Sequence, residues 1–302
     1  MDSEMLYLNG EFMALNEGRV DVEDRGFQLG DGVYEVIRVM NGHLVWLGDH
    51  LERLGRSLAA VRLTGALREH QLDGLLPELV ERSRVRDGIV YVQVTRGAAP
   101  REFVFPHPPH PTVLAYARSK PFPGPAEILA GAILHPLEDQ RWARCDIKSI
   151  SLLAAVLAKE EAREAGAHEA LFLSPDGVVR EGGSSNVFAL LHGVLRTHPL
   201  NERILGGITR KHVLEIAHEA GQAIDERAFT LEEVTCASRD GCEVFTASTV
   251  KGIQPVVRIG AHVIGNGSPG RVTLNLLDSM LRAQALLVGR RPPPAFASPA
   301  PR

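Results

Sequence analysis

The sequence predicts a mixed α/β protein of two domains, and three observations support this fold class. Residues 33–39 and 89–95 alternate apolar with polar side chains and are rich in β-branched or aromatic types, which is typical of strands. Between them, residues 50–63 and 72–83 carry apolar side chains at helical spacing. A Pro/Gly cluster, SKPFPGPAE at residues 119–127, then interrupts the pattern before strand-like and helix-like segments resume.

The remaining elements follow in chain order. A further strand is expected at residues 112–118. After the Pro/Gly cluster we expect short strands near residues 132–134, 170–173 and 187–191, and helices near residues 152–165, 209–220 and 271–287. The predicted divisions are a small N-terminal α/β domain (1–119), a linker (120–127), a larger C-terminal domain (128–288) and a Pro/Ala-rich, disordered tail (289–302). Two such domains favour a ligand site in a cleft between them.

The composition is that of a soluble globular protein. The chain has 302 residues, is 44% hydrophobic and 23% charged, and carries a formal net charge of -4. It therefore lacks the basic footprint of a nucleic-acid-binding protein. No apolar stretch reaches the roughly 18 to 20 residues of a membrane helix, and the acidic start MDSEMLYLNGEF is unlike a signal peptide. We therefore expect a cytoplasmic protein.

The cysteines and histidines do not predict a metal site. Cys145, Cys236 and Cys242 are odd in number and form no C-x-x-C motif, which argues against a disulfide framework or structural zinc. The 12 histidines include no H-E-x-x-H motif, and HPPHP is typical of a loop. We expect no metal cofactor.

Lys148 stands in an unusual context, RCDIKSISLLAAVLAKEEAREAG. The helical run after it opens with LLAAVLA, which is apolar on every side and is therefore expected to be buried. Burial and the positive end of that helix would both favour the neutral amine, the nucleophilic form that makes Schiff bases. Alternatively, Lys148 pairs with Asp146 at a partly exposed turn. This segment alone leaves both interpretations open.

Three other segments carry polar groups at turns. Glu181 enters the turn Gly-Gly-Ser-Ser-Asn, where a carboxylate could pair with a protonated ring nitrogen. Gly206 and Gly207 lead into a helix that Thr209 helps to open, which forms an anion site if the turn is not merely structural. Residues 248–249, a serine and a threonine, end a strand. Together with Lys148, these groups are what pyridoxal 5′-phosphate requires.

With these residues assembled, the sequence resembles the class IV (fold type IV) pyridoxal-phosphate aminotransferases, and within them the bacterial D-amino acid enzymes. The similarity runs from about Tyr7 to the last helix. The matching stretches are EDRGFQLGDGVYEV (23–36), HLERL (50–54), YVQVTRG (91–97), RWARCDIKS (141–149), EGGSSNVF (181–188) and GGITR (206–210). The resemblance implies an α+β fold of two domains with the cofactor in the interdomain cleft.

The resemblance also implies roles for individual residues. Lys148 would bind the cofactor as a Schiff base and move the proton between substrate Cα and cofactor C4′. Glu181 would bind the pyridine nitrogen. The phosphate would be held by Arg53, Ile208, Thr209, Ser248 and Thr249. The ring would contact Leu205 and Ser184, beside Ser185, and the substrate would meet Tyr34, Tyr91, Arg101 and Phe103. Arg101 would come from the other subunit of a homodimer.

Phe103 is a departure from the family pattern. The D-amino acid enzymes usually place a histidine two positions after the arginine that corresponds to Arg101, whereas this chain reads AAPREFVFP. A phenyl ring cannot donate a hydrogen bond to a carboxylate, so a more apolar substrate, or an amine without a carboxylate, becomes possible. Arg101 still offers one charge-assisted contact, which favours amino acids.

The predicted function is therefore a ping-pong transaminase that moves the amino group of a D-amino acid to a 2-oxo acid, 2-oxoglutarate or pyruvate. The alternatives are an (R)-selective amine transaminase, a branched-chain aminotransferase and an aminodeoxychorismate lyase of the same fold. Lys251 and Gly252 are reminiscent of the lyase. A binding protein without catalysis is the alternative from another class, and the presence of both Lys148 and Glu181 argues against it.

Overall fold

The computed structural model describes residues 4–236, 241–291 and 296, and its internal contacts divide the chain into two units. The first unit comprises Met1–Phe122 and Ile147–Leu152, and the second comprises Pro123–Asp146 and Leu153–Arg302. The short segment Ile147–Leu152, which carries Lys148, therefore packs with the N-terminal part of the chain although it lies beyond the predicted linker.

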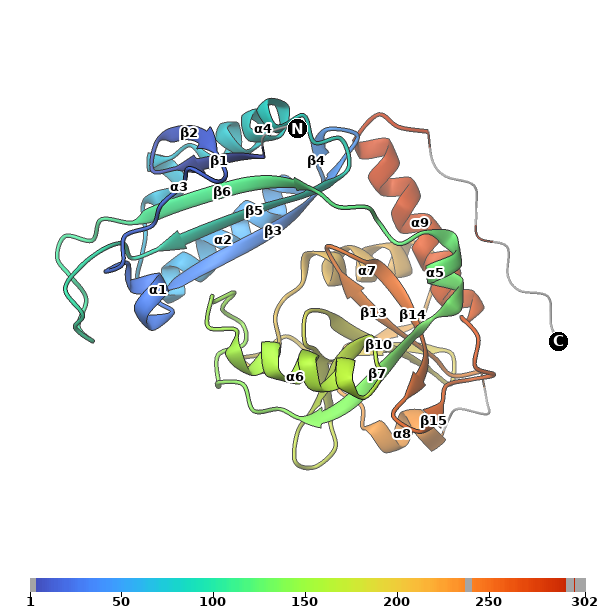
Figure 1. Cartoon of the computed structure of the whole chain (residues 1–302). Helices are drawn as coiled ribbons and strands as arrows, with labels where there is room; N and C mark the ends of the chain where they lie inside the picture. The colour runs from blue at the N-terminus through green and yellow to red at the C-terminus, as the bar shows by residue number, and fades with distance from the viewer. Residues whose placement is uncertain (1–3, 237–240, 292–295, 297–302) are drawn as a thin grey trace. The chain divides into compact units, whose positions relative to one another are not determined.

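The first unit is built on a six-stranded antiparallel sheet, in the order β2-β1-β6-β5-β3-β4 (Figure 1). Its strands are β1 (Met5–Leu8), β2 (Glu11–Ala14), β3 (Gly32–Met40), β4 (His43–Leu44), β5 (Gly88–Thr95) and β6 (Thr112–Ser119). The predictions of strands at 33–39, 89–95 and 112–118 are confirmed. Buried and partly buried side chains alternate along most of β5 and in the first half of β3, as the period of two requires, whereas the last four residues of β3 are all buried.

The helices of the first unit are α1 (Arg25–Leu29), α2 (Leu47–Ala60), α3 (Ala66–Glu69) and α4 (Leu72–Ser83), and the predicted helices at 50–63 and 72–83 are confirmed. Helices α2 and α4 pack on the sheet. Leu54 and Leu58 of α2 and Leu76 of α4 are buried in one apolar core with Val33 and Ile37 of β3. This packing fixes α2 beside β3, where most polar groups of the first unit's candidate site lie.

The second unit holds a nine-stranded sheet in the order β12-β11-β10-β13-β14-β7-β8-β9, with β15 paired to β14. Its strands are β7 (Ala132–Glu138), β8 (Glu169–Leu173), β9 (Val179–Gly182), β10 (Asn186–Leu191), β11 (Val194–Thr197), β12 (Ile224–Asp225), β13 (Glu243–Ser248), β14 (Gly252–Ile259) and β15 (His262–Val263). One further pairing, Glu181 with Asn186, joins β9 back to β10 and closes six of the strands into a ring. The closure therefore falls at the predicted cofactor carboxylate.

The helices of the second unit are α5 (Pro125–Ala130), α6 (Leu153–Glu164), α7 (Ile208–Glu219), α8 (Leu231–Cys236) and α9 (Arg271–Leu287). The helices predicted at 152–165, 209–220 and 271–287 are confirmed, and the last three residues of the predicted linker begin α5. Helices α7 and α9 pack on each other and on β13 (Figure 1). The predicted tail 289–302 lies largely outside the described residues.

The expected burial of the start of α6 is wrong. Leu153 is 71% exposed, and Val156 and Leu157 are 58% and 62% exposed, whereas Ala162 near the end of the helix is buried. An apolar run permits burial on any side, but only the face of the helix against β8 and β7 is covered within the unit. The start of α6 therefore presents an apolar surface.

Candidate active site

Lys148 lies alongside β3 in the first unit. Its carbonyl accepts a hydrogen bond from the Tyr34 amide at 3.0 Å, and its own amide donates to Ser57 Oγ at 3.2 Å. These bonds hold the backbone, and the half-buried side chain places Nζ 4.3 Å from the centroid of the Tyr34 ring. The carboxylate of Asp146 pairs with Arg144 at 2.9 Å, so the structure gives Asp146 another cation in place of Lys148.

Arg53 is buried in an ion pair next to this lysine's segment. Its guanidinium donates two hydrogen bonds of 2.7 Å to the Glu35 carboxylate, and His50 Nδ1 lies 2.8 Å from the same carboxylate. Burial raises the pKa of Glu35, but Arg53 and His50 outweigh burial and hold it at about 2. Because Glu35 is then ionised, the His50 ring donates from Nδ1. Sequence reasoning named Arg53 and missed Glu35 and His50.

Three tyrosines form a stack on neighbouring strands of the first sheet. The ring centroids of Tyr34 and Tyr91 are 5.6 Å apart, and those of Tyr91 and Tyr116 are 5.2 Å apart. Tyr91 also donates to Gln93 at 2.6 Å, and burial raises its pKa. The phenol is therefore a hydrogen-bond donor at neutral pH. Tyr116 was missed, although its place opposite Tyr91 follows from the strand register.

Arg101 and Phe103 lie on the connection between β5 and β6, in the first unit. Both are exposed, Phe103 at 83%, and the Arg101 guanidinium carbon is 5.8 Å from the Phe103 ring centroid. The structure brings these two predicted substrate residues together at one loop tip. It leaves the guanidinium available to a ligand carboxylate.

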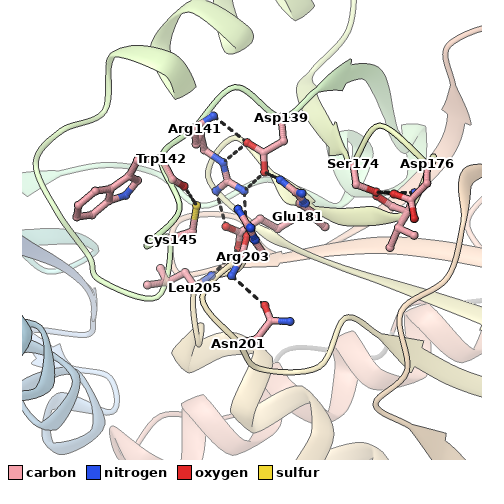
Figure 2. Close-up of polar contacts among 12 residues, drawn as sticks. Asp139, Arg141, Trp142, Cys145, Ser174, Asp176, Glu181, Asn201, Arg203 and Leu205 are labelled. Atoms are coloured by element: carbon pink, nitrogen blue, oxygen red, sulfur yellow. Dashed lines mark hydrogen bonds and ion pairs between the residues drawn. The ribbon is translucent and has the colours of Figure 1, made fainter.

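Glu181 is the centre of the second unit's polar cluster (Figure 2). Its carboxylate accepts hydrogen bonds from Arg141 at 2.5 Å, from the Leu205 amide at 3.0 Å and from the Asn186 amide group at 3.1 Å. Asn186 in turn donates to the Leu205 carbonyl at 2.8 Å. Burial raises the pKa of Glu181 to about 6, while Arg141 and the Leu205 amide oppose the rise.

Arg141 joins this carboxylate to a second one. Its guanidinium donates to both oxygens of Asp139 at 2.9 Å, and Arg180 donates to the same carboxylate at 2.8 Å. The two arginines hold the pKa of Asp139 below its usual range against the opposing effect of burial. Sequence reasoning gave Arg141 no role, because its partner Glu181 lies 40 residues further along the chain.

Four of the five predicted phosphate ligands gather at the start of α7 and the end of β13, whereas the fifth, Arg53, belongs to α2 of the first unit. Ile208 and Thr209 open α7 and are buried, and Gly207 caps the helix without a side chain. Ser248 is the last residue of β13, and Thr249 follows it in the turn to β14. Since α7 packs on β13, the helix start and the hydroxyls offer donors of the kind that phosphate accepts.

Ser184 and Ser185 differ in their partners. Ser184 Oγ donates to Glu169 at 2.9 Å and lies 2.8 Å from Lys159 Nζ, so α6 and β8 hold this hydroxyl. Ser185 Oγ is buried and has no hydrogen-bond partner among the described residues. A buried hydroxyl without a partner is costly unless a ligand or water completes it.

Neither a metal site nor a membrane-spanning helix is found in the described part of the chain. It contains no cluster of three or more His, Cys, Asp or Glu side chains that could hold a metal ion. No helix within it has the length and apolarity needed to cross a membrane.

Comparison with known proteins gives a consistent result. The family model Amino-transferase class IV matches residues 32–259. The chain is 44% identical to D-alanine aminotransferase of Bacillus licheniformis, over 90% of this chain and 94% of that protein, and 40% identical to the Staphylococcus haemolyticus enzyme, over 90% and 95%. The branched-chain aminotransferase of Thermoproteus uzoniensis, solved with norvaline, superposes with a TM-score of 0.80 at 28% identity, covering 93% of this chain and 94% of that one.

Proposed function

The chain belongs to the class IV aminotransferases, and from this premise we propose that it transfers the amino group of a D-amino acid to a 2-oxo acid, with pyridoxal 5′-phosphate as cofactor. The similarity to D-alanine aminotransferases over nine tenths of the chain supports this donor class. The acceptor is 2-oxoglutarate or pyruvate, and the two half-reactions alternate. The observation that carries the proposal is the buried Glu181 carboxylate, held by Arg141, Asn186 and the Leu205 amide.

The donor set of the second unit fits this cofactor. Glu181 is a buried anionic acceptor suited to a protonated ring nitrogen. The start of α7 with Thr209, and the hydroxyls of residues 248–249, suit a phosphate. Ser185 Oγ is a buried hydroxyl that lacks a partner among the described residues, as expected where a ligand belongs. Leu205 and Ile208 add apolar contact.

Each residue then has a task that its surroundings support. Bound pyridoxal phosphate supplies an aldehyde that condenses with amines and a protonated ring that accepts electron density from the substrate. Glu181 would hold the ring nitrogen, and its charge would favour the protonated form of that nitrogen. Lys148 Nζ, on a backbone fixed against β3 and α2, would hold the cofactor at its aldehyde carbon, and once the substrate amine displaces it, the freed amine would move the proton of the substrate Cα.

The substrate residues come from the first unit. Arg101 binds the substrate carboxylate, and the phenol of Tyr34 or Tyr91 supplies a further hydrogen bond. We place Arg101 in the active site of the other subunit of a homodimer. The exposed apolar side chains at the start of α6 support a homodimer, because a second copy of the chain would cover such a surface. The proposed setting is the cytoplasm.

A second candidate activity rests on Phe103, whose apolar ring stands beside Arg101 and favours an (R)-amine without a carboxylate.

To test the proposed function against the alternatives, purified holoenzyme is mixed with D-alanine, L-alanine, (R)-1-phenylethylamine or aminodeoxychorismate, and the cofactor absorbance is followed. We expect rapid conversion with D-alanine and none with L-alanine. Faster conversion with the amine, or pyruvate release from aminodeoxychorismate, would replace the proposal by the corresponding activity.

The role of Lys148 is tested by Lys148→Ala, with Lys120→Ala as the matched control because Lys120 is exposed and lies outside the candidate site. Lys148→Ala is expected to abolish turnover and the covalent attachment of the cofactor after borohydride reduction. Lys120→Ala is expected to retain both. Substantial transaminase activity in Lys148→Ala contradicts the proposal.

A further inference from the structure

A tight cluster of charges lies at the base of the loop that carries Arg101 and Phe103. Asp31 accepts hydrogen bonds from Arg25 Nε at 2.9 Å and from Arg96 Nε and Nη2 at 2.8 and 3.0 Å. Arg25 and Arg96 are only 3% and 2% exposed. One carboxylate therefore serves two buried guanidinium groups.

Asp31 has too few acceptor positions for all the N–H groups of the two guanidinium groups. Backbone carbonyls accept hydrogen bonds from the N–H groups that Asp31 does not reach. Arg96 donates to the carbonyls of Val61 and Arg62, at 2.6 and 3.3 Å. Arg25 Nη1 donates to the carbonyl of Glu102 at 2.5 Å. Glu102 lies between Arg101 and Phe103 in the chain. The buried Arg25 guanidinium therefore forms a hydrogen bond with the backbone of the loop tip.

Further contacts hold the rest of the same loop. The Arg25 amide donates to the Gly97 carbonyl at 2.9 Å, and the Ala99 amide donates to the Glu23 carbonyl at 3.3 Å. On the far side of the tip, the Phe105 ring centroid lies 3.6 Å from the Arg96 guanidinium carbon. Residues 97–105 are thus attached before, at and after the two exposed side chains.

We propose that Arg25, oriented by Asp31, is a positioning residue that sets how tightly the enzyme binds its amino donor, by fixing the backbone between Arg101 and Phe103. Arg25 does not touch the substrate. It holds the Glu102 carbonyl, and the direction of this peptide decides where the Arg101 guanidinium and the Phe103 ring point. The inference rests on the proposed binding of the substrate carboxylate by Arg101.

The geometry also explains why arginine is needed at position 25. Its Nε donates to the Asp31 carboxylate, and its Nη1 donates to the Glu102 carbonyl. Two nitrogens of one planar guanidinium group thus bind two different acceptors. A lysine has a single ammonium on a flexible stem and cannot reproduce this fork. Arg25→Lys therefore keeps the charge and releases the loop.

The experiment uses the holoenzyme and four variants: Arg25→Lys, Arg101→Met, Phe105→Leu and, as the matched control, Arg19→Lys. Arg19 also donates to nearby carbonyls, of Asn16 and Gly18, but is outside the cluster. KM and kcat are measured with D-alanine, and hydrogen exchange of the amides of residues 97–105 is followed by mass spectrometry. Cofactor absorbance reports whether each variant is folded and loaded.

We expect Arg25→Lys to raise KM for D-alanine at least about tenfold, the scale of one hydrogen bond to a charged group, with a much smaller change in kcat. Exchange in residues 97–105 should accelerate by a similar factor while absorbance is unchanged. Phe105→Leu, at a residue that is 37% exposed, should change both quantities in the same direction by about two- to fivefold. Arg19→Lys should change neither.

The outcomes separate this inference from the proposed function. If Arg101→Met raises KM but Arg25→Lys and Phe105→Leu leave KM and loop exchange unchanged, the inference is wrong and the proposed function stands. If Arg101→Met leaves KM for D-alanine unchanged, the proposed role of Arg101 is wrong, and the inference about Arg25 is wrong as well. A variant that loses the cofactor absorbance is replaced in the test by Phe105→Leu, which removes the ring contact with Arg96 but keeps an apolar side chain.

Discussion

Each unit of the protein buries one glutamate against one arginine, yet the two carboxylates are tuned in opposite directions. Glu35 meets Arg53 through two parallel hydrogen bonds and His50 through a third, and its pKa is held at about 2. Glu181 shares Arg141 with Asp139, and burial raises its pKa to about 6. Burial raises the pKa of both carboxyl groups; Arg53 and His50 outweigh it at Glu35, whereas Arg141 and the Leu205 amide do not outweigh it at Glu181.

Under the proposed function, this difference distinguishes a structural carboxylate from one that binds the cofactor. Glu35 is ionised under all ordinary conditions and serves to hold Arg53 and His50 in place. Glu181 is kept close to the range in which a carboxyl group exchanges protons, which suits a partner for a ring nitrogen. The comparison predicts that Glu181 matters mainly to catalysis and Glu35 mainly to stability.

The largest expected effect is that of Glu181→Gln on turnover. The variant removes the charge that supports a protonated ring nitrogen, and we expect kcat with D-alanine to fall by about 10²- to 10⁴-fold, the scale of a group that stabilises charge in a transition state. Arg141 keeps Asp139 as a partner, so the fold should survive.

Steady-state kinetics and the absorbance spectrum of the bound cofactor check this prediction. Glu160→Gln is the control, because Glu160 is exposed and pairs with Arg163 on the surface of α6. An unchanged kcat in Glu181→Gln would contradict the prediction that Glu181 matters mainly to catalysis.

The second prediction concerns Glu35→Gln. It leaves Arg53 and His50 buried without a carboxylate, and removing one partner of a buried pair costs about 3–5 kcal/mol. We expect a loss of that order in the free energy of unfolding, measured by urea denaturation of the cofactor-free protein. A loss below about 1 kcal/mol would show that the pair contributes no more than an exposed one.

The family, and the main helices and strands, could be predicted from the sequence because their patterns are local. The period of two in β3 and β5 and the helical spacing in α4 and α9 gave bounds within a residue of those observed. The four-residue strands β1 and β2 were missed, since their pairing partners and not their composition define them. The class IV aminotransferase assignment is confirmed by the comparisons.

The candidate site was predictable only in part. Glu181 and Thr209 stand at turns with recognisable glycines, whereas Arg141 and Glu35 act through partners 40 and 18 residues away. Pairing at that separation is decided by the fold. The same reason explains the error at α6, because an apolar run does not state which of its sides the rest of the chain covers.

The third prediction is that the two glutamates give stability profiles of opposite slope with pH. Folding lowers the pKa of Glu35 from 4.5 to about 2, so its stabilisation is present above pH 4.5 and is lost as the pH falls toward 2. Folding raises the pKa of Glu181 from 4.5 to about 6, so its contribution is present below pH 4.5 and is lost as the pH rises through 6.

Urea denaturation of the cofactor-free wild type and of the two glutamine variants measures these slopes. The wild-type advantage over Glu35→Gln should shrink by about 2 kcal/mol between about pH 5 and pH 3. The difference between wild type and Glu181→Gln should move against the wild type by about 2 kcal/mol between about pH 4 and pH 7. Parallel profiles would mean that the two carboxyls are not tuned differently.

The smallest expected effect comes from a third Glu–Arg pair, on the same helix as Arg53. Glu52 and Arg56 are joined at 2.5 Å on α2, but their side chains are 69% and 59% exposed. Water and salt screen such a pair, so Glu52→Gln should change the free energy of unfolding by less than about 0.5 kcal/mol, with no effect on KM. The two pairs share their residue types and an arginine on α2, but the Glu35 pair is buried, has two parallel hydrogen bonds and includes His50. A loss as large as that of Glu35→Gln would show that burial and the additional hydrogen bonds of the Glu35 pair add nothing to its energy.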